Sequence, residues 1–146
     1  MPLELSSEID LEKLQSEDHN VILRCPFKQC NTRIIKYSPS FIQISVDNAP
    51  QTVKATKDEL PTIERPTNFY QIDNVWDFDN IGVSRPSSIS DDPIIGHDST
   101  VKIDRLLICS ECDKGPLGFA GIPTDKEHHH TNLKYFLSCN STMYEV

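Results

Sequence analysis

Two pairs of cysteines, far apart in the chain, constrain the fold of this sequence more than any other feature. The first pair is Cys25 and Cys30, and the second is Cys109 and Cys112. Zinc binds four ligands tetrahedrally and favours thiolates, and a short Cys-containing turn supplies two of them from one place. Two residues separate the second pair, as is usual, but four separate the first, so its loop must bulge for the sulfurs to converge. We predict one structural zinc that joins two distant parts of the chain.

Disulfide bonds are the alternative use of these cysteines. Disulfides belong to oxidising compartments, whereas pairs at these spacings in a cytosolic protein are more often metal ligands or catalytic. The first twenty residues hold six acidic residues, one basic residue and no apolar run, unlike a secretory signal. No later stretch approaches the ~20 apolar residues of a membrane span. The sequence therefore favours zinc, and a cytoplasmic protein that does not insert into membranes.

The length of the chain indicates how many domains it forms, and its charge indicates which classes of partner it can bind. A chain of 146 residues fits one domain and buries ~68% of its unfolded surface. We expect a flexible acidic segment over 1–20 and one zinc-binding domain over 21–146, present as a monomer. With 14 basic against 22 acidic residues the net charge is -8, and such a surface repels the phosphate backbone of nucleic acids. Nucleic acid is therefore not an expected partner.

Short apolar segments rich in Ile and Val predict a mainly β fold. Only residues 9–14 indicate a helix. Segments 47–68 and 86–100 carry prolines among polar residues, so both are predicted as loops. The serines of the second loop are interpreted as solvated, with regulatory phosphorylation as the alternative. Strands are predicted over 21–24, 32–37, 41–46, 102–108, 117–122 and 133–139.

The segment 68–85 is dense in both aromatic residues and carboxylates. One interpretation is a core strand with polar residues at its exposed positions. The other is a recognition loop, in which aromatic anchors and outward carboxylates form a protein-binding patch. Five apolar side chains are expected to anchor the segment and three polar ones to face outward: Val75, Trp76, Phe78, Ile81 and Val83 inward, and Asp77, Asp79 and Asn80 outward.

Taken together, two motifs resemble the Mss-four/Dss-four family of zinc-binding Rab interactors. They are Trp76-Asp-Phe-Asp-Asn-Ile-Gly-Val-Ser-Arg85 and Leu107-Ile-Cys-Ser-Glu-Cys-Asp-Lys-Gly-Pro-Leu-Gly118, with a Cys pair upstream. The resemblance runs from about residue 21 to the C terminus, and the longer first spacing resembles the fungal branch. It implies an Mss-four-like fold of antiparallel sheets in which one structural zinc joins two Cys knuckles. It also implies binding to nucleotide-free Rab/Ypt/Sec-type small GTPases of secretory vesicle transport and release of their GDP or GTP.

The resemblance places the GTPase-binding surface around the zinc site. Outward carboxylates there can compete for Mg²⁺ or for the phosphate-binding lysine, while aromatic surface holds a switch segment open. A holdase-like chaperone with slow nucleotide release would use the same surface, and the charges of the second knuckle can instead be merely solvated. The candidate GTPase contacts are Trp76, Asp77, Phe78, Asp79, Asn80, Glu111, Asp113 and Lys114.

A methionine-R-sulfoxide reductase-like enzyme is the alternative to a GTPase regulator. Such enzymes share a related β fold and a four-Cys zinc site, and the fifth cysteine, Cys139, would be the nucleophile. A catalytic thiol needs exposure and a lowered pKa, yet Cys139 follows an apolar run and lacks the Arg-Tyr that precedes the nucleophile in those enzymes. The run His128 to His130 is interpreted as a solvated turn, because four thiolates already complete the zinc shell.

Overall fold

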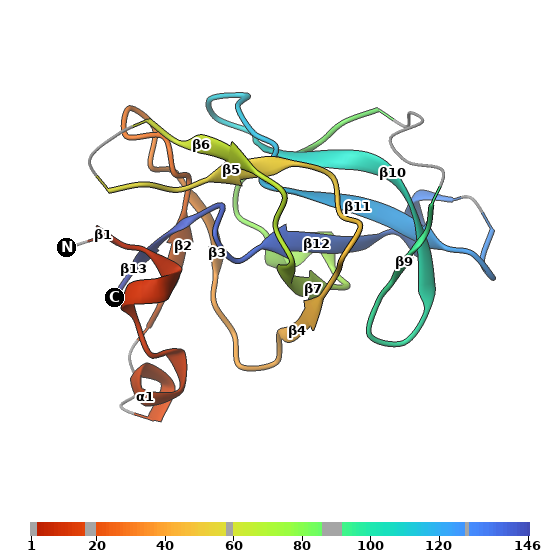
Figure 1. Cartoon of the computed structure of the whole chain (residues 1–146), viewed down its shortest axis with the longest axis horizontal. Coiled ribbons are helices and arrows are strands. Elements are labelled where there is room, and N and C mark those ends of the chain that lie inside the picture. Colours follow the sequence, from red (N-terminus) through yellow and green to blue (C-terminus); the bar gives the residue numbers. More distant parts are fainter. Residues whose placement is uncertain (1–2, 17–19, 58–59, 86–91, 128) are drawn as a thin grey trace.

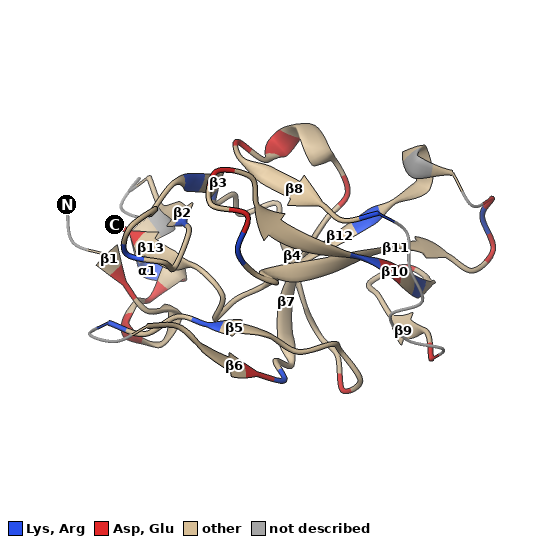
Figure 2. Cartoon of the chain, turned by 90° about the horizontal axis from the view of Figure 1, so that it is seen from above, with Lys and Arg blue, Asp and Glu red and all other residues tan. Residues whose placement is uncertain are grey.

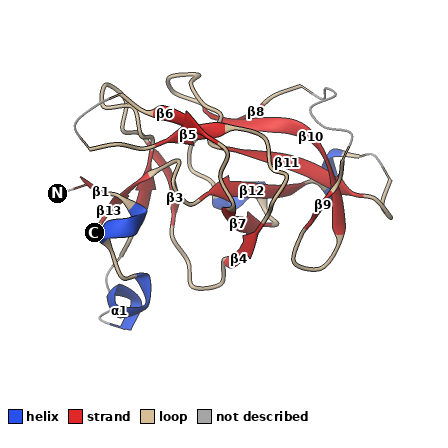
Figure 3. Cartoon of the chain, in the orientation of Figure 1, coloured by secondary structure: helices blue, strands red, loops and turns tan. Residues whose placement is uncertain are grey.

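A computed structural model describes residues 3–16, 20–57, 60–85, 92–127 and 129–146. Most of these residues lie in antiparallel strands or in the turns that join them, and the helices are short (Figure 3). The prediction of a mainly β fold is confirmed. Among the described residues, no helix has the length and apolar content needed to cross a membrane.

Two larger sheets stand side by side along the long axis of the molecule (Figure 1). The smaller has the strand order β1-β13-β2-β3 and holds both chain ends. Its strands are β1 (Leu3–Glu4), β2 (Ile22–Arg24), β3 (Arg33–Lys36) and β13 (Met143–Glu145). The larger has the order β4-β7-β12-β11-β10-β8, with β9 paired to β10. Its strands are β4 (Ile42–Ser45), β7 (Asn68–Ile72), β8 (Ile81–Val83), β9 (Ile94–Ile95), β10 (Thr100–Cys109), β11 (Gly118–Pro123) and β12 (Lys134–Ser138).

All six predicted strands are present, as β2, β3, β4, β10, β11 and β12. The remaining strands have two to five residues each, so their apolar pattern is too short to distinguish them from loops. The helix indicated over 9–14 appears as α1 (Leu11–Ser16), which follows the 3-10 turn η1 (Ser6–Glu8).

The segment 47–68, predicted as a loop, contains the hairpin of β5 (Thr52–Lys54) and β6 (Thr62–Glu64). Its outer positions are polar, but Val53 and Ala55 are buried. Their amides donate to the carbonyls of Pro116 and Asn140 at 2.9 and 2.8 Å, which fixes the hairpin to the rest of the chain. In the second predicted loop, β9 and the start of β10 occupy part of 92–100. Ser87, Ser88 and Ser90 lie outside the described residues.

The acidic N-terminal segment, expected to be flexible, contacts the domain at several points. Strand β1 pairs with β13, and Ile9, Leu11 and Leu14 pack against the core. Lys57 of the β5–β6 hairpin lies 2.8 Å from a carboxylate oxygen of Glu4. The segment therefore extends the smaller sheet by one strand.

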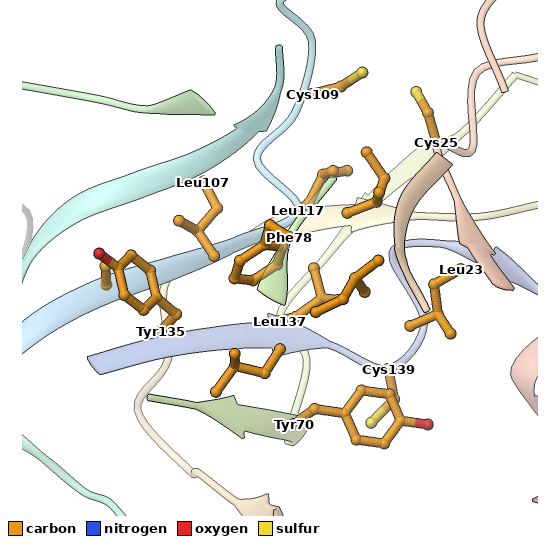
Figure 4. Close-up of a cluster of buried hydrophobic side chains, with 14 of the residues drawn as sticks. Leu23, Cys25, Tyr70, Phe78, Leu107, Cys109, Leu117, Tyr135, Leu137 and Cys139 are labelled. Carbon is orange, nitrogen blue, oxygen red and sulfur yellow. The ribbon is translucent and has the colours of Figure 1, made fainter. Parts of the chain in front are cut away.

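The main hydrophobic core fills the space between the two sheets. It includes Leu23 and Ile35 from the smaller sheet and Tyr70, Leu107 and Leu137 from the larger one (Figure 4). A second cluster covers the other face of the larger sheet, where Phe119 stacks on Phe136 with ring centroids 4.9 Å apart. Strands β11 and β12 are buried on both faces, which explains their nearly continuous apolar sequence.

We expect Gly118→Ala to destabilise the fold by about 3 kcal/mol or more. A Cβ at this position would clash with the backbone carbonyl oxygen of Phe136 on the neighbouring strand, which has no room to move. The free energy of unfolding in urea measures the effect.

Gly82→Ala is the matched control. Its Cβ would lie 2.9 Å from Cγ1 of Ile108, a side-chain atom that can rotate away, so the expected cost is about 1 kcal/mol. Equal losses for the two variants would contradict the packing described for β11.

Candidate metal centre and adjoining surface

The four cysteines of the two distant pairs converge on one point between the two sheets. Their sulfur atoms all lie within 4.8 Å of one another. The separations Cys25 Sγ to Cys112 Sγ and Cys30 Sγ to Cys109 Sγ are both 3.7 Å, and none of the five cysteines forms a disulfide. Four thiolates at ~2.3 Å from a tetrahedral zinc stand about 3.8 Å apart. The donor set and its spacing therefore suit a tetrahedral metal ion.

The first knuckle runs from the end of β2 to the start of β3. The amide of Cys30 donates to the carbonyl of Phe27 at 2.9 Å, and that of Cys25 donates to the carbonyl of Thr32 at 2.8 Å. Asn31 closes the turn with φ 48°, and its side-chain amide donates to the Cys25 carbonyl at 2.8 Å. Asn tolerates this left-handed backbone better than most residues do. This is how a loop with two extra residues brings its thiols together.

The second knuckle continues directly from β10. The amide of Cys109 donates to the carbonyl of Lys114 at 3.0 Å, and that of Asp113 donates to the carbonyl of Cys109 at 2.9 Å. Asp113 has φ 59°, so its backbone is left-handed, like that of Asn31 in the first knuckle. The ammonium of Lys114 lies 5.1 Å from the centre of the Phe27 ring, so a cation–π contact also joins the two knuckles.

Burial of the thiols favours a bound cation. Desolvation raises the pKa of Cys25 well above its ordinary value and also raises that of Cys109. Burial also acts to raise the pKa of Cys30, but hydrogen bonding to Thr32 and to the neighbouring thiols outweighs it and lowers the pKa to about 7. A divalent ion compensates the charge of desolvated thiolates, which explains how four of them can share one buried site.

The aromatic and acidic segment 73–80 lies next to this centre. Cys109 pairs with Ile81 across β10 and β8, so the segment before β8 ends beside the candidate metal ligands. On its other side, the amide of Asp79 donates to the carbonyl of Ile34 at 2.8 Å, and Phe78 bridges to Ile35. The segment is therefore attached to both sheets.

Trp76 and Phe78 lie on opposite sides of this segment, which corrects the expectation that both anchor it. The Trp76 side chain lies in the 3-10 turn η2 (Val75–Asp77) and is 88% exposed. Phe78 is buried, with its ring centroid 6.0 Å from that of Tyr135 (Figure 4). Asn74 caps η2 by accepting the amide of Trp76 at 3.0 Å. Phe78 thus holds the turn in place while Trp76 is presented to solvent.

The polar residues of the segment also differ in what they contact. A carboxylate oxygen of Asp79 accepts from Nε of Arg33 at 2.6 Å, and the Asn80 side-chain amide donates to the Arg33 carbonyl at 2.9 Å. Asp79 is exposed, as expected, and Asn80 is half-buried; both also fasten the segment to β3. Asp77 is exposed, and its backbone amide donates to the Asn74 carbonyl at 3.1 Å. Glu111, in the second knuckle, is exposed as well.

Cys139 lies at the opposite end of the core from the metal-site thiols (Figure 4). It is 6% exposed, and desolvation raises its pKa to about 12. A thiol that stays protonated and out of reach of solvent is a poor nucleophile, which argues against the reductase alternative. Of the histidine run, His129 makes a 2.8 Å contact between its Nδ1 and the Thr131 hydroxyl, and His128 lies outside the described residues.

A cleft of about 490 Å³ opens beside Trp76, and no sequence motif pointed to it. Two of its lining residues, Arg105 and Tyr135, flank the small Ala120 in one cross-strand row of the larger sheet. The side chains around the cleft come from four segments of the chain. They are Asp73, Asn74, Val75, Trp76, Val83, Arg105, Thr131, Leu133 and Tyr135.

Two comparisons with known proteins agree with this geometry. The family model described as "Mss4 protein" matches residues 20–143. Protein DSS4 of Saccharomyces cerevisiae is 31% identical over 138 residues, an alignment that covers 80% of this chain and 92% of that protein. No solved structure is a significant match.

We expect the purified protein to hold one zinc ion per chain and Cys112→Ser to lose it. Metal binding and folding are coupled at structural sites, so this variant should also unfold at a lower temperature. Metal content is measured by atomic emission after gel filtration, and unfolding is followed by circular dichroism.

Cys139→Ser is the matched control, because it changes a buried cysteine remote from the metal site. It should keep its zinc. A Cys112→Ser protein with the metal content of the wild type would contradict the assignment of this ligand.

Proposed function

The chain belongs to the Mss4 protein family, and from this premise we propose that it is a guanine nucleotide release factor for Rab/Ypt/Sec-type small GTPases of secretory vesicle transport. Membership of the family supports a role in nucleotide exchange on small GTPases, which makes the protein a regulator of another enzyme. We further propose that it acts in the cytoplasm as a monomer, reaches secretory membranes only through the GTPase, and has zinc as its one structural metal.

The exposed Trp76, on the segment that leads to the strand paired with Cys109, is the observation that carries this proposal. Trp is rarely left with most of its surface in water, and here η2 holds it there with a capped turn. Trp is also prominent among the residues that dominate protein–protein binding energy. An exposed Trp flanked by the carboxylate of Asp77, on a segment attached to both sheets, is suited to binding a partner protein.

Nucleotide release requires differential binding. A GTPase that holds nucleotide with ~pM affinity has about 16 kcal/mol of binding free energy. A partner that binds the loaded and empty states equally shifts nothing, so the factor must prefer the empty or partly opened GTPase. A preformed surface suits this role, because the factor then loses little conformational entropy when it meets the open state.

The geometry divides the candidate contacts by their roles. Trp76 and Asp77 are presented to the GTPase, as are Glu111 and Lys114 of the second knuckle. In the proposed complex the Trp76 ring packs on a switch segment, while the carboxylates compete for Mg²⁺ or for the phosphate-binding lysine. The other candidates position this surface: Phe78 through burial, Asp79 and Asn80 through Arg33, and Asp113 through its turn.

Basic and acidic residues are interspersed along the described part of the backbone (Figure 2). The strong acidic excess of the sequence therefore acts as an overall field rather than through one patch. Emptying a GTPase exposes basic groups that held the phosphates, so an acidic factor is attracted more strongly to the empty than to the loaded form. This agrees with the proposed preference and with the expectation that nucleic acid is not a partner.

We expect the wild-type protein to accelerate release of fluorescent GDP from a secretory Rab, and Trp76→Ala to reduce that rate about tenfold or more. Truncation removes the apolar contact without removing any core packing. Stopped-flow fluorescence at increasing factor concentration gives the rate, and a pull-down with nucleotide-free GTPase gives the binding.

Ile95→Ala is the matched control, since Ile95 is 77% exposed on β9, at the other end of β10. It should release nucleotide like the wild type. Stable binding of the empty GTPase without faster release would identify a holdase-like chaperone instead. Unchanged rates for Trp76→Ala would contradict the proposed surface.

A further inference from the structure

We propose that the cleft beside Trp76, which we call the Trp76 cleft, binds a partner segment in which an apolar side chain stands next to a carboxylate. The inference rests on the proposed function, because the partner is taken to be the small GTPase. It adds Arg105 and Tyr135, which no sequence motif marked, to the residues that recognise it.

The floor of the Trp76 cleft is a row across the larger sheet. Arg105 on β10 pairs with Ala120 on β11, and Ala120 pairs with Tyr135 on β12. In this row the small Ala120 separates two long side chains that both line the cleft. Leu133, Val75 and Val83 line the same space, so an apolar side chain that enters the cleft is removed from water on several sides.

Two of the side chains that line this space, Arg105 and Tyr135, carry hydrogen-bond donors. Arg105 Nε is buried and has no hydrogen-bond partner among the described residues. Oδ1 of Asp104 lies 4.0 Å from it, which is close enough for electrostatic attraction but too far for a hydrogen bond. The Tyr135 side chain is almost fully buried, yet its hydroxyl points away from the core cluster (Figure 4) and donates to no described residue.

Arg105 and Tyr135 line the same cleft, and the charge of Arg105 influences the Tyr135 hydroxyl. Burial raises the pKa of Tyr135, and the positive charge of Arg105 offsets part of that rise. A guanidinium and a phenol beside an apolar pocket are suited to a carboxylate, which can accept from both at once. The acid at the rim, Asp73, is paired with Lys134 at 3.4 Å, so its charge is largely compensated.

A protein segment fits this cleft better than a free anion does. The exposed ring of Trp76 forms one wall, which offers a flat apolar surface next to the donors. Strand β8, whose end contributes Val83, is an outer strand of the larger sheet. A turn or loop of a partner protein can therefore approach beside β8 and place one apolar side chain in the cleft and the neighbouring carboxylate at Arg105.

The test measures affinity for nucleotide-free GTPase with Arg105→Gln, which removes the charge but keeps much of the side-chain length. We expect at least about a tenfold loss of affinity. Arg105→Lys should recover only part of it, because Lys lacks the planar fork of donors. Arg65→Gln, at an exposed position outside the cleft, is the matched control and should bind like the wild type.

Each Asp and Glu in the switch segments of the GTPase is then changed to its amide and combined with Arg105→Gln. One carboxylate should show a double-mutant coupling of about tenfold, since its loss matters only while Arg105 is present. If no carboxylate couples to Arg105, the proposal is overturned, even when release activity is intact.

A nuclear magnetic resonance titration separates this inference from the proposed function. The probes are acetyl-Leu-Asp-amide and acetyl-Leu-Asn-amide at millimolar concentration, followed at the Trp76 indole and Arg105 Nε signals. The acid should shift both signals more than the amide does, whether or not the protein acts on a GTPase. Equal shifts from both probes, or none from either, would refute carboxylate recognition in the cleft.

Discussion

The convergence of four thiols on one point determines how the two sheets meet. Cys25 and Cys30 belong to the turn that joins β2 and β3, whereas Cys109 ends β10 and Cys112 follows it. Apart from the bridge between Ile35 and Phe78, the ladders of the described strands do not cross between the two sheets. The core can slide, because hydrophobic contact is non-directional. Directional bonds from four sulfurs to one ion would fix the relative position of the sheets.

This constraint matters for function because segment 73–80 is attached to both sheets. Its end pairs with β10 through Ile81, and Asp79 and Asn80 bind to β3. A shift of one sheet against the other would strain these bonds and move Trp76. A metal bound at this centre would therefore not need to touch a partner in order to affect recognition, since it would set the geometry of the residues proposed to do so.

The sequence was most informative where chemistry alone decides the outcome. Thiol spacing predicted the cluster of Cys25, Cys30, Cys109 and Cys112, and the longer apolar runs predicted six strands. It was least informative about which side chains of 75–80 face the core and which face solvent. Alternation along a strand would place Trp76 and Phe78 on the same face, but η2 inserts a turn that rotates one against the other. The Trp76 cleft depends on which residues pair across β10, β11 and β12, and the register comes from tertiary packing rather than from local pattern.

Rigidity and charge together suggest where the proposed selectivity for an empty GTPase would originate. The recognition segment is capped by Asn74, anchored by Phe78 and joined to Arg33, so it is largely ordered before binding. A preformed surface cannot discriminate between two states by folding onto only one of them. The difference must then lie in what the GTPase offers, which is exposed basic groups and an opened switch segment once the nucleotide has left. In the proposed complex the acidic excess of this chain attracts the exposed basic groups. Trp76 and its cleft contact the opened switch segment. Salt screens long-range electrostatic attraction but not apolar contact. A rise in ionic strength should therefore slow the association of the two proteins, while the apolar contact at Trp76 persists.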